Sequence, residues 1–259
     1  MAKLFHLSDV HFGAEDPNAL AWFAACVRDE SPDAVIMTGD LTMRATRGEF
    51  DAGARWLGGL GVPVTVEIGN HDVPYYSDPL RRLFRPYHRY AAVERMLERP
   101  LAVPGVTVVP LKTVARLQWR VDQSKGRVSE HSLAAALQLI AAAPKDDLIL
   151  VAAHHPLLDA GLTEATRTRG GGAALERLAA AGADAVLSGH VHYPFDLPVE
   201  RAGRTIRLIG CGTLSKRLRH TPPGFNEIRA EGRRFETIAR AMTPAPDAVL
   251  GEGKADPDA

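Results

Sequence analysis

The sequence of 259 residues predicts a layered fold that mixes α-helices with β-strands. Three observations predict it. Short apolar runs alternate with stretches whose apolar residues recur at helical spacing. Alternating runs near the C-terminus indicate antiparallel strands, and the chain is long enough to bury a substantial core. We expect one domain over residues 1–242 and a disordered tail over 243–259, which is rich in Pro, Gly, Asp and Ala.

The N-terminal part contains two successive units of strand, polar loop, helix and strand. Apolar runs predict the strands, and apolar residues at helical spacing predict the helices. The strands are expected at residues 4–10, 34–37 and 62–68, and the helices between them at 17–30 and 49–60. Each apolar run ends at a polar or glycine-containing segment, which indicates the start of a loop.

The remainder of the chain repeats this alternation and then becomes rich in strands. Strands are expected at residues 106–111, 148–152, 185–187, 205–209 and 225–228, and helices at 78–99, 133–140 and 173–181. The last two strands belong to a series of alternating runs that begins at Phe195 and predicts antiparallel pairing.

Composition narrows the class of protein. The 31 basic and 31 acidic residues give a formal net charge of zero, so we expect neither nucleic acid nor an anionic membrane as a partner. The two cysteines, Cys26 and Cys211, have no metal-binding spacing and are expected to be reduced thiols. Because the chain shows no signal peptide and no apolar run of membrane-spanning length, we expect a cytoplasmic protein.

Five polar segments, widely separated along the chain, carry groups that bind divalent metals. They are Asp-Val-His at residues 9–11, Gly-Asp at 39–40, Gly-Asn-His-Asp at 69–72, His-His at 154–155 and Gly-His-Val-His at 189–192. Most of them follow a predicted strand, and loops at the carboxyl ends of strands in such folds meet at one edge. A single segment of this kind is typical of an ordinary polar turn, but five in series predict a metal site.

The spacing within the segments favours shared ligation. Asp9 and His11 lie two residues apart, so in an extended chain their side chains would point the same way. The same argument applies to His190 and His192. Asp40 has two carboxylate oxygens and can therefore bridge two ions.

The remaining donors suggest the kind of metal and the chemistry. Asn70 supplies an amide oxygen and His154 an imidazole, and such mixed ligation without thiolate suits Mn, Fe, Zn or Co. Two neighbouring ions can activate a water and clamp the oxygens of a phosphoryl group. His71 is expected to protonate the leaving group or to stabilise the phosphoryl charge, and Asp72 to orient the His71 ring.

These segments resemble the motifs of the calcineurin-like metallophosphoesterase superfamily, which read DxH, GD, GNH followed by D or E, a lone H, and GHxH. The order is the same here, and the resemblance covers residues 9–192. It implies an α+β fold, a four-layer α/β/β/α sandwich with two mixed β-sheets flanked by helices. It implies a metal-dependent phosphoric ester hydrolase with His71 catalytic. The implied ligands are Asp9, His11, Asp40 and His192 for one ion, and Asp40, Asn70, His154 and His190 for the other.

Some candidate residues have competing explanations. Either His154 or His155 can be the ligand, although relatives with one histidine read H-x-P here, which aligns His154 with the ligand and leaves His155 beside the site. Tyr75 is a candidate for stacking on a nucleobase, and Arg81 for binding a phosphate. Ordinary packing and a solvated helix face explain these two at least as well. His6 is expected to be a core or surface histidine.

Residues 39–42 and 69–74 are similar to those of small bacterial class III cyclic-nucleotide phosphodiesterases and their glycerophosphodiesterase relatives. The resemblance implies hydrolysis of a small phosphodiester by attack of a metal-bridging hydroxide. The alternative is a pyrophosphatase acting on a nucleotide-linked lipid precursor such as a UDP-diacylglucosamine. A repair nuclease and a non-catalytic scaffold fit less well, because the chain is neutral and retains His71. A homodimer is compatible with the sequence, and residues 104–126 match no subgroup.

Overall fold

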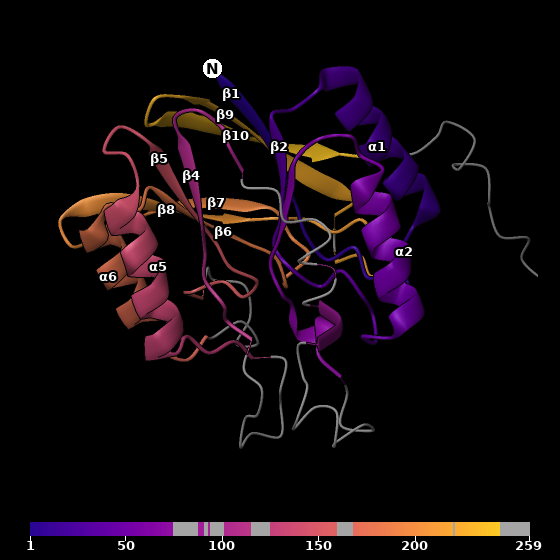
Figure 1. The fold of residues 1–259 in the computed structure, drawn as a ribbon, viewed down its shortest axis with the longest axis horizontal. Helices are drawn as coiled ribbons and strands as arrows, with labels where there is room; N and C mark the ends of the chain where they lie inside the picture. The colour runs from indigo at the N-terminus through magenta and orange to yellow at the C-terminus, as the bar shows by residue number, and fades with distance from the viewer. Residues whose placement is uncertain are drawn as a thin grey trace, which may run out of the picture.

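The computed structural model of the chain describes residues 1–74, 88–90, 93, 101–114, 125–159, 168–219 and 221–243. In these residues the strands form two five-stranded β-sheets that face each other, and helices cover the outer side of each sheet (Figure 1). The layers therefore run helix, sheet, sheet, helix. This arrangement confirms the α+β four-layer sandwich that the family resemblance implied.

The first sheet combines the two N-terminal strand–helix units with the C-terminal hairpin. Its order is β10-β9-β1-β2-β3, with β1, β2 and β3 parallel and β9 antiparallel to both its neighbours. Its strands are β1 (Ala2–Leu7), β2 (Ala34–Met37), β3 (Val64–Val66), β9 (Gly224–Glu231) and β10 (Arg234–Ala241), and its helices are α1 (Pro17–Glu30) and α2 (Arg47–Gly58). A short 3-10 helix, η1 (Asn70–Asp72), follows β3.

The second sheet has the order β4-β5-β6-β8-β7, in which only β7 runs antiparallel to its neighbour. Its strands are β4 (Val106–Pro110), β5 (Leu148–Ala152), β6 (Ala185–Ser188), β7 (Phe195–Arg201) and β8 (Arg204–Gly210), and its helices are α5 (Glu130–Ala142) and α6 (Gly171–Ala181). The carboxyl ends of β5 and β6 consequently lie at the same edge of this sheet.

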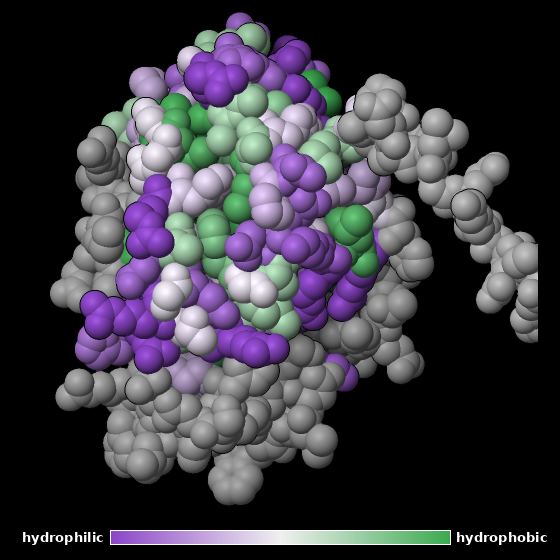
Figure 2. Space-filling model, turned by 90° about the vertical axis from the view of Figure 1, so that its right-hand side faces the viewer, coloured by the Kyte–Doolittle hydropathy of each residue, from purple (hydrophilic) through white to green (hydrophobic). Residues whose placement is uncertain are grey.

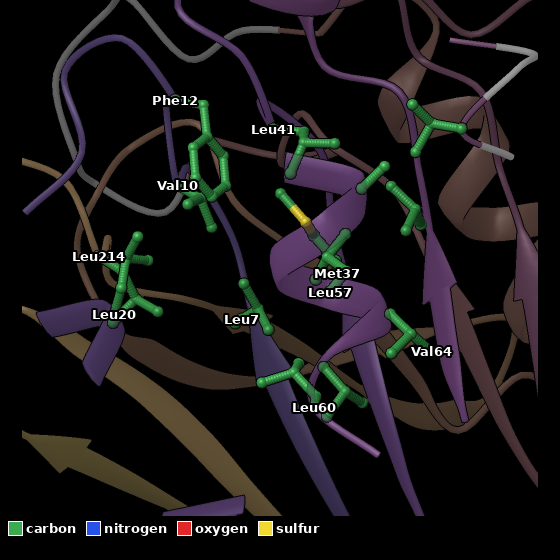
Figure 3. Packing of buried hydrophobic residues seen from close by; sticks show 14 of the residues in the cluster. Leu7, Val10, Phe12, Leu20, Met37, Leu41, Leu57, Leu60, Val64 and Leu214 are labelled. Atoms are coloured by element: carbon green, nitrogen blue, oxygen red, sulfur yellow. The ribbon is translucent and has the colours of Figure 1, made fainter. Parts of the chain in front are cut away.

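Three apolar layers join the four structural layers. The first lies between the first sheet and helices α1 and α2, where the rings of Phe5, Phe23 and Phe225 pack at centroid distances of 4.7 to 6.1 Å. Figure 3 shows the aliphatic part of this layer around Met37 and Leu57. The second apolar layer lies between the second sheet and helices α5 and α6.

The third apolar layer lies between the sheets and fixes how they sit against each other. Leu4 and Ile36 come from the first sheet, and Leu150 and Leu187 come from the second, and all four are completely buried. Burial of one such side chain contributes about 1.5–3 kcal/mol. Because this packing locks the two sheets together, the loops that leave them at one edge are also held in place.

Local signals define where the helices begin. At the start of α1, Asp16 accepts a hydrogen bond from the main-chain N–H of Asn18 at 2.9 Å, and Pro17 occupies the first turn. Thr46 and Glu49 form a capping box at the start of α2. The outward face of these two helices interleaves hydrophilic and hydrophobic residues (Figure 2), which is typical of a surface that faces solvent.

The predicted elements agree with the structure in type but less well at their ends. The expected ranges 17–30, 34–37 and 148–152 coincide with α1, β2 and β5. Strand β1 ends at Leu7, earlier than expected, because the backbone turns into the left-handed region at Asp9. Helix α2 begins two residues earlier than expected, because Thr46 caps it.

The sequence predicted the type of each element better than it predicted which strands pair with each other. The expected antiparallel pairs exist as β7 with β8 and β9 with β10, but the two hairpins belong to different sheets. Sequence alternation cannot reveal this, because the partner of a strand depends on packing elsewhere. Most of the expected helix at 78–99 and nearly all of the expected tail at 243–259 lie outside the described residues, and the single domain stays a prediction.

A polar network lies within the core beneath the edge where the loops gather. His6 places Nε2 2.9 Å from Thr38 Oγ1 and Nδ1 3.2 Å from the Asn226 amide nitrogen, which also donates to the carbonyl of Gly210. Since an amide nitrogen can only donate, Nδ1 of His6 accepts and the ring is neutral. Burial accordingly lowers the pKa of His6 to about 3, against an opposing contribution from Asp9.

This burial predicts a pH dependence of stability. Between pH 6.5 and about 3, the unfolded chain binds a proton at His6 that the folded chain excludes, so stability falls as the pH falls. We expect His6→Gln to lower the slope of unfolding free energy against pH by up to about 1.4 kcal/mol per unit in this window. Urea unfolding with EDTA at several pH values measures it. Equal slopes in the wild type and the variant would contradict it.

Candidate metal centre

The five polar segments of the sequence meet at one edge of the sandwich. Asp9, Asp40 and the η1 residues follow strands of the first sheet, whereas His154 and His190 follow strands of the second. Main-chain hydrogen bonds join the segments, with Asp9 N–H donating to Gly39 O at 3.0 Å and Gly189 N–H donating to His154 O at 3.0 Å. Both sheets therefore contribute to one buried cluster of metal-binding groups.

One group of donors consists of Asp9, His11 and His192. The Nε2 atom of His192 lies 3.0 Å from Asp9 Oδ1 and 3.2 Å from His11 Nε2, and His11 Nε2 lies 3.7 Å from Asp9 Oδ1. All three side chains are buried. Their ligand atoms all lie within 4.8 Å of one another, which is close enough for all three to contact one metal ion.

A second group lies on the other side of Asp40. His154 places Nε2 3.0 Å from Asn70 Oδ1 and 3.4 Å from Asp40 Oδ2. The same Asp40 oxygen is 3.8 Å from His11 Nε2, so this carboxylate stands between the two groups. The His190 ring lies 5.3 Å, centroid to centroid, from that of His154. The seven residues expected as ligands are therefore all brought together.

The chemistry of these donors fits bound metal ions. The Nδ1 atoms of His192 and His154 lie 2.6 Å from Arg217 O and 2.8 Å from Thr38 O, so each Nδ1 carries the proton and Nε2 faces the centre. Ligand atoms about 2.1 Å from one ion lie about 3.0 to 3.4 Å apart. The separations described above, 3.0 to 3.8 Å, are close to this. Several sets of three donors lie within 4.8 Å of one another.

The protonation states also suit ligation. Burial opposes the charges of Asp9 and Asp40, but His192 and His154 outweigh it, so both carboxyl pKa values lie below their usual range. Burial lowers the pKa of His11 to about 4, which leaves its ring neutral. Burial also disfavours the charge on His154, but Asp40 outweighs it and raises the pKa to about 9. A metal ion bound at His154 must therefore displace a proton.

The backbone of the loops that carry the candidate ligands is not extended, in contrast to the expectation from the spacing of these residues. Asp9, His11, Asp40, His190 and His192 all have φ between 51° and 70°. Non-glycine residues are uncommon in this left-handed region, and such strain clusters at functional sites. The premise that the paired residues project from an extended chain is therefore wrong. Tight turns, and not strand pleating, aim their side chains at the centre.

The glycines of the motifs are needed because the loops pack without room for a side chain. A Cβ at Gly69 would overlap the side chain and main chain of Asp40, and one at Gly189 would overlap Ser8 and Asp9. Gly39 has φ of 95°, and its Cβ would lie 2.6 Å from His154 Nδ1. Each glycine therefore permits a contact that places a donor.

His71 lies beside the donors and is held by the main chain. Its N–H donates to Asp40 Oδ1 at 2.8 Å, and its ring Nδ1 lies 2.9 Å from Met43 O. Its Nε2 then faces the centre, 3.0 Å from Arg217 Nη1. The ring packs edge-on against that of His11 at 4.8 Å.

Asp72 occupies a different position from the one expected. Its carboxylate accepts hydrogen bonds from the main-chain N–H groups of Leu41, Thr42 and Gly69 and from the Thr42 hydroxyl, at 2.8 to 3.2 Å. Asp72 thus joins the second and third motif loops, whereas the Met43 carbonyl orients the His71 ring. Burial and the charge of Asp40 raise the pKa of Asp72 to about 7.

His155, Tyr75 and Arg81 are the remaining candidates from the sequence. His155 is buried with Nδ1 2.9 Å from Thr113 Oγ1, and its ring lies 4.5 Å from that of His190. Because the His154 ring faces Asn70 and Asp40, the geometry favours His154 as the ligand and His155 as its neighbour. Tyr75 and Arg81 lie outside the described residues.

Sequence reasoning missed the residues that support the centre. Thr213 Oγ1 donates to Asp9 O at 2.6 Å, and Thr38 and Arg217 supply the carbonyls that orient two ligand rings. Thr42, whose hydroxyl donates to Asp72, was noted in the sequence only as a residue of the second motif. Thr213 and Arg217 carry no metal-ligand signal, since they follow β8 and act through tertiary contacts.

The sequence profile of the calcineurin-like phosphoesterase family matches residues 2–194, which include every candidate ligand. The chain belongs to this family. The family resemblance inferred from the five segments is confirmed. The family uses a dinuclear metal centre, with which the clusters of His and Asp described above are compatible.

Other proteins resemble this chain in sequence or in fold. A probable cyclic nucleotide phosphodiesterase of Rhodopseudomonas palustris is 29% identical over 170 residues, which are 62% of this chain and 59% of that protein. The match thus spans about three fifths of the relative's length. Two solved structures share the fold. A dimetal phosphatase from Danio rerio has a TM-score of 0.60 and 14% identity, covering 93% of this chain and 99% of the other. The phosphopantetheinyl hydrolase of Mycobacterium tuberculosis has a TM-score of 0.54 and 18% identity, covering 82% and 90%.

Among the helices of the described residues, none combines the length and the apolar character that crossing a lipid bilayer requires. The expected cytoplasmic location and the homodimer stay predictions.

The contact between Gly69 and Asp40 predicts the effect of a single methyl group. We expect Gly69→Ala to displace Asp40, to reduce metal content and to lower stability by about 1–3 kcal/mol. Gly58→Ala is the matched control, because a Cβ there meets nothing within 4 Å and helix α2 gains about 0.5–1 kcal/mol. Elemental analysis and urea unfolding measure both. Full metal content in Gly69→Ala would exclude the proposed crowding of Asp40.

Proposed function

We propose that the chain is a dinuclear-metal phosphodiesterase that hydrolyses a small phosphodiester of the cyclic-nucleotide or glycerophosphodiester type. The position of Asp40 carries this proposal. Its carboxylate lies within 4 Å of imidazoles from both donor groups, as a bridging ligand must. The curated relative, which is named a probable cyclic nucleotide phosphodiesterase, supports the substrate class.

The proposed ligands follow from the two donor groups. One ion would be held by Asp9, His11, Asp40 and His192, and the other by Asp40, Asn70, His154 and His190. The donor set is nitrogen and oxygen without thiolate, which favours Mn, Fe, Zn or Co over Mg or Ca. The buried thiol of Cys211 lies outside the set and donates to the carbonyl of His6.

Hydrolysis forms a bond between phosphorus and an oxygen from water and breaks the bond between phosphorus and the leaving oxygen, which must gain a proton. A bound pair of ions lowers the pKa of water and neutralises phosphoryl oxygens. His71 supplies the proton from Nε2 when its ring is an imidazolium, because the Met43 carbonyl accepts from Nδ1–H and leaves Nε2 directed at the centre. Asp40 fixes the position of His71 by accepting its main-chain N–H. The same carboxylate thus links ligation to proton transfer.

The pyrophosphatase alternative requires an apolar surface for a lipid. Leu157, which follows the fourth motif, is buried in the apolar layer beneath α5 and α6. Its side chain is therefore part of the core and does not offer an apolar surface to a lipid. Leu158 packs partly against the same layer, and Leu162 lies outside the described residues. The described residues accordingly favour a small substrate.

A substrate panel tests the proposed function. The protein is stripped with EDTA, reconstituted with manganese, and assayed on cyclic AMP, a glycerophosphodiester, bis(p-nitrophenyl) phosphate and a UDP-diacylglucosamine. We expect diester hydrolysis that is lost with EDTA and restored by manganese. Turnover of the UDP-lipid alone would select the alternative, and no metal-dependent turnover at all would reject both.

Replacement of His71 tests its role as proton donor. We expect His71→Ala to retain metal and to lower kcat about 10²–10⁴-fold on a substrate with an alkoxide leaving group. The loss should be smaller on bis(p-nitrophenyl) phosphate, because p-nitrophenolate leaves with little need of a proton. His131→Ala, at an exposed position of α5, is the control. Equal losses on both substrates would assign His71 a role other than proton donation.

A further inference from the structure

One arginine outside the sequence motifs reaches into the metal centre. Arg217 lies in the loop after β8 and is half-buried. Its Nη1 atom is 3.0 Å from His71 Nε2 and 3.4 Å from His11 Nε2. The guanidinium therefore lies at the meeting point of a proposed ligand and the proposed proton donor.

The loop that carries this arginine is the one that supports the ligands. The main-chain oxygen of Arg217 lies 2.6 Å from Nδ1 of His192, and its N–H donates to Ser215 Oγ at 3.2 Å. Ser215 N–H donates to Thr213 Oγ1, which in turn donates to the carbonyl of Asp9. These contacts fix the backbone of Arg217 beside the centre, and a side-chain substitution leaves them intact.

Within the part of the chain that the structure describes, the charge of Arg217 has no carboxylate partner. Among the ion pairs of the described residues, Arg207, Arg229, Arg233 and Arg240 each pair with an acidic side chain, and Arg217 takes part in none. A guanidinium stays protonated at any ordinary pH. The nearest groups on either side are imidazoles, which do not neutralise it.

A cation in this position requires an anion. Metal ions bound by the neighbouring imidazoles would repel the guanidinium, unless a negative group lies between the ions and the guanidinium. The non-bridging oxygens of a phosphate meet this need, and the planar fork of arginine binds two such oxygens at once. A phosphodiester on the centre would also lie within reach of His71, which contacts the same guanidinium.

We propose that Arg217 binds the phosphate of the substrate and positions it between the metal ions and His71. The inference rests on the proposed function and deepens it by naming a substrate-binding residue. Arg217 supplies charge and orientation to the phosphate, whereas the leaving oxygen takes its proton from His71.

Binding of inorganic phosphate tests the proposal without turnover. Calorimetry on the manganese-loaded protein compares the wild type with Arg217→Gln, which removes the charge, and Arg217→Lys, which keeps it but removes the fork. We expect the phosphate Kd to rise about 10–100-fold in Arg217→Gln and severalfold in Arg217→Lys, with metal content unchanged. Arg219→Gln is the matched control, since Arg219 lies in the same loop and is exposed. On bis(p-nitrophenyl) phosphate, KM should rise in the order control, Lys, Gln.

The outcomes separate the two proposals. Wild-type phosphate affinity in metal-replete Arg217→Gln would overturn the role of Arg217, even if the diesterase activity is confirmed. Loss of metal in both Arg217 variants would also overturn it, because the side chain would then serve the metal site. If the wild type hydrolyses no diester, the proposed function fails, and the phosphate titration still decides whether Arg217 binds the anion.

Discussion

The placement of the Asp40 carboxylate is the constraint on which the rest of the site depends. One of its oxygens accepts the His71 N–H, and the other lies near His11 and His154. A buried carboxylate with no partner would be costly, and a buried cluster of imidazoles without a negative charge would bind cations poorly. The crowding of Asp40 against Gly69 and the bracing of its loop by Asp72 are the means that hold it there.

The fold explains why the donors can be so close. Parallel strands deliver their loops to one edge of each sheet, and the apolar layer between the sheets brings the two edges together. The loops then turn through the left-handed region at five ligand positions, which costs backbone energy at each. The hydrogen bonds among the loops and the packing beneath them offset that cost. The stability of the sandwich thus supports local strain at the centre.

Most of the elements and all of the candidate ligands could be predicted from the sequence, because both leave local signals. Apolar periodicity predicted α1, β2 and β5, and the residue types of the five segments made Asp9 and Asp40 candidate metal ligands. The sequence could not reveal the left-handed turns, because Asp and His adopt this conformation more often than most residues but still only in a minority of cases. Nor could it reveal the position of Arg217, which reaches the centre only because the loop after β8 folds back onto His192.

The first donor set combines Asp9 and His11 from one sheet with His192 from the other, and Asp40 and His154 are similarly divided. A bound pair of ions would therefore be coordinated by residues of both sheets and would hold the two halves of the sandwich together. Sliding of one half against the other by a fraction of an ångström would alter the spacing of the ions themselves. Asn226, which donates from β9 of the first sheet to the carbonyl of Gly210 in the second sheet, is one of the buried contacts that hold the two halves in register.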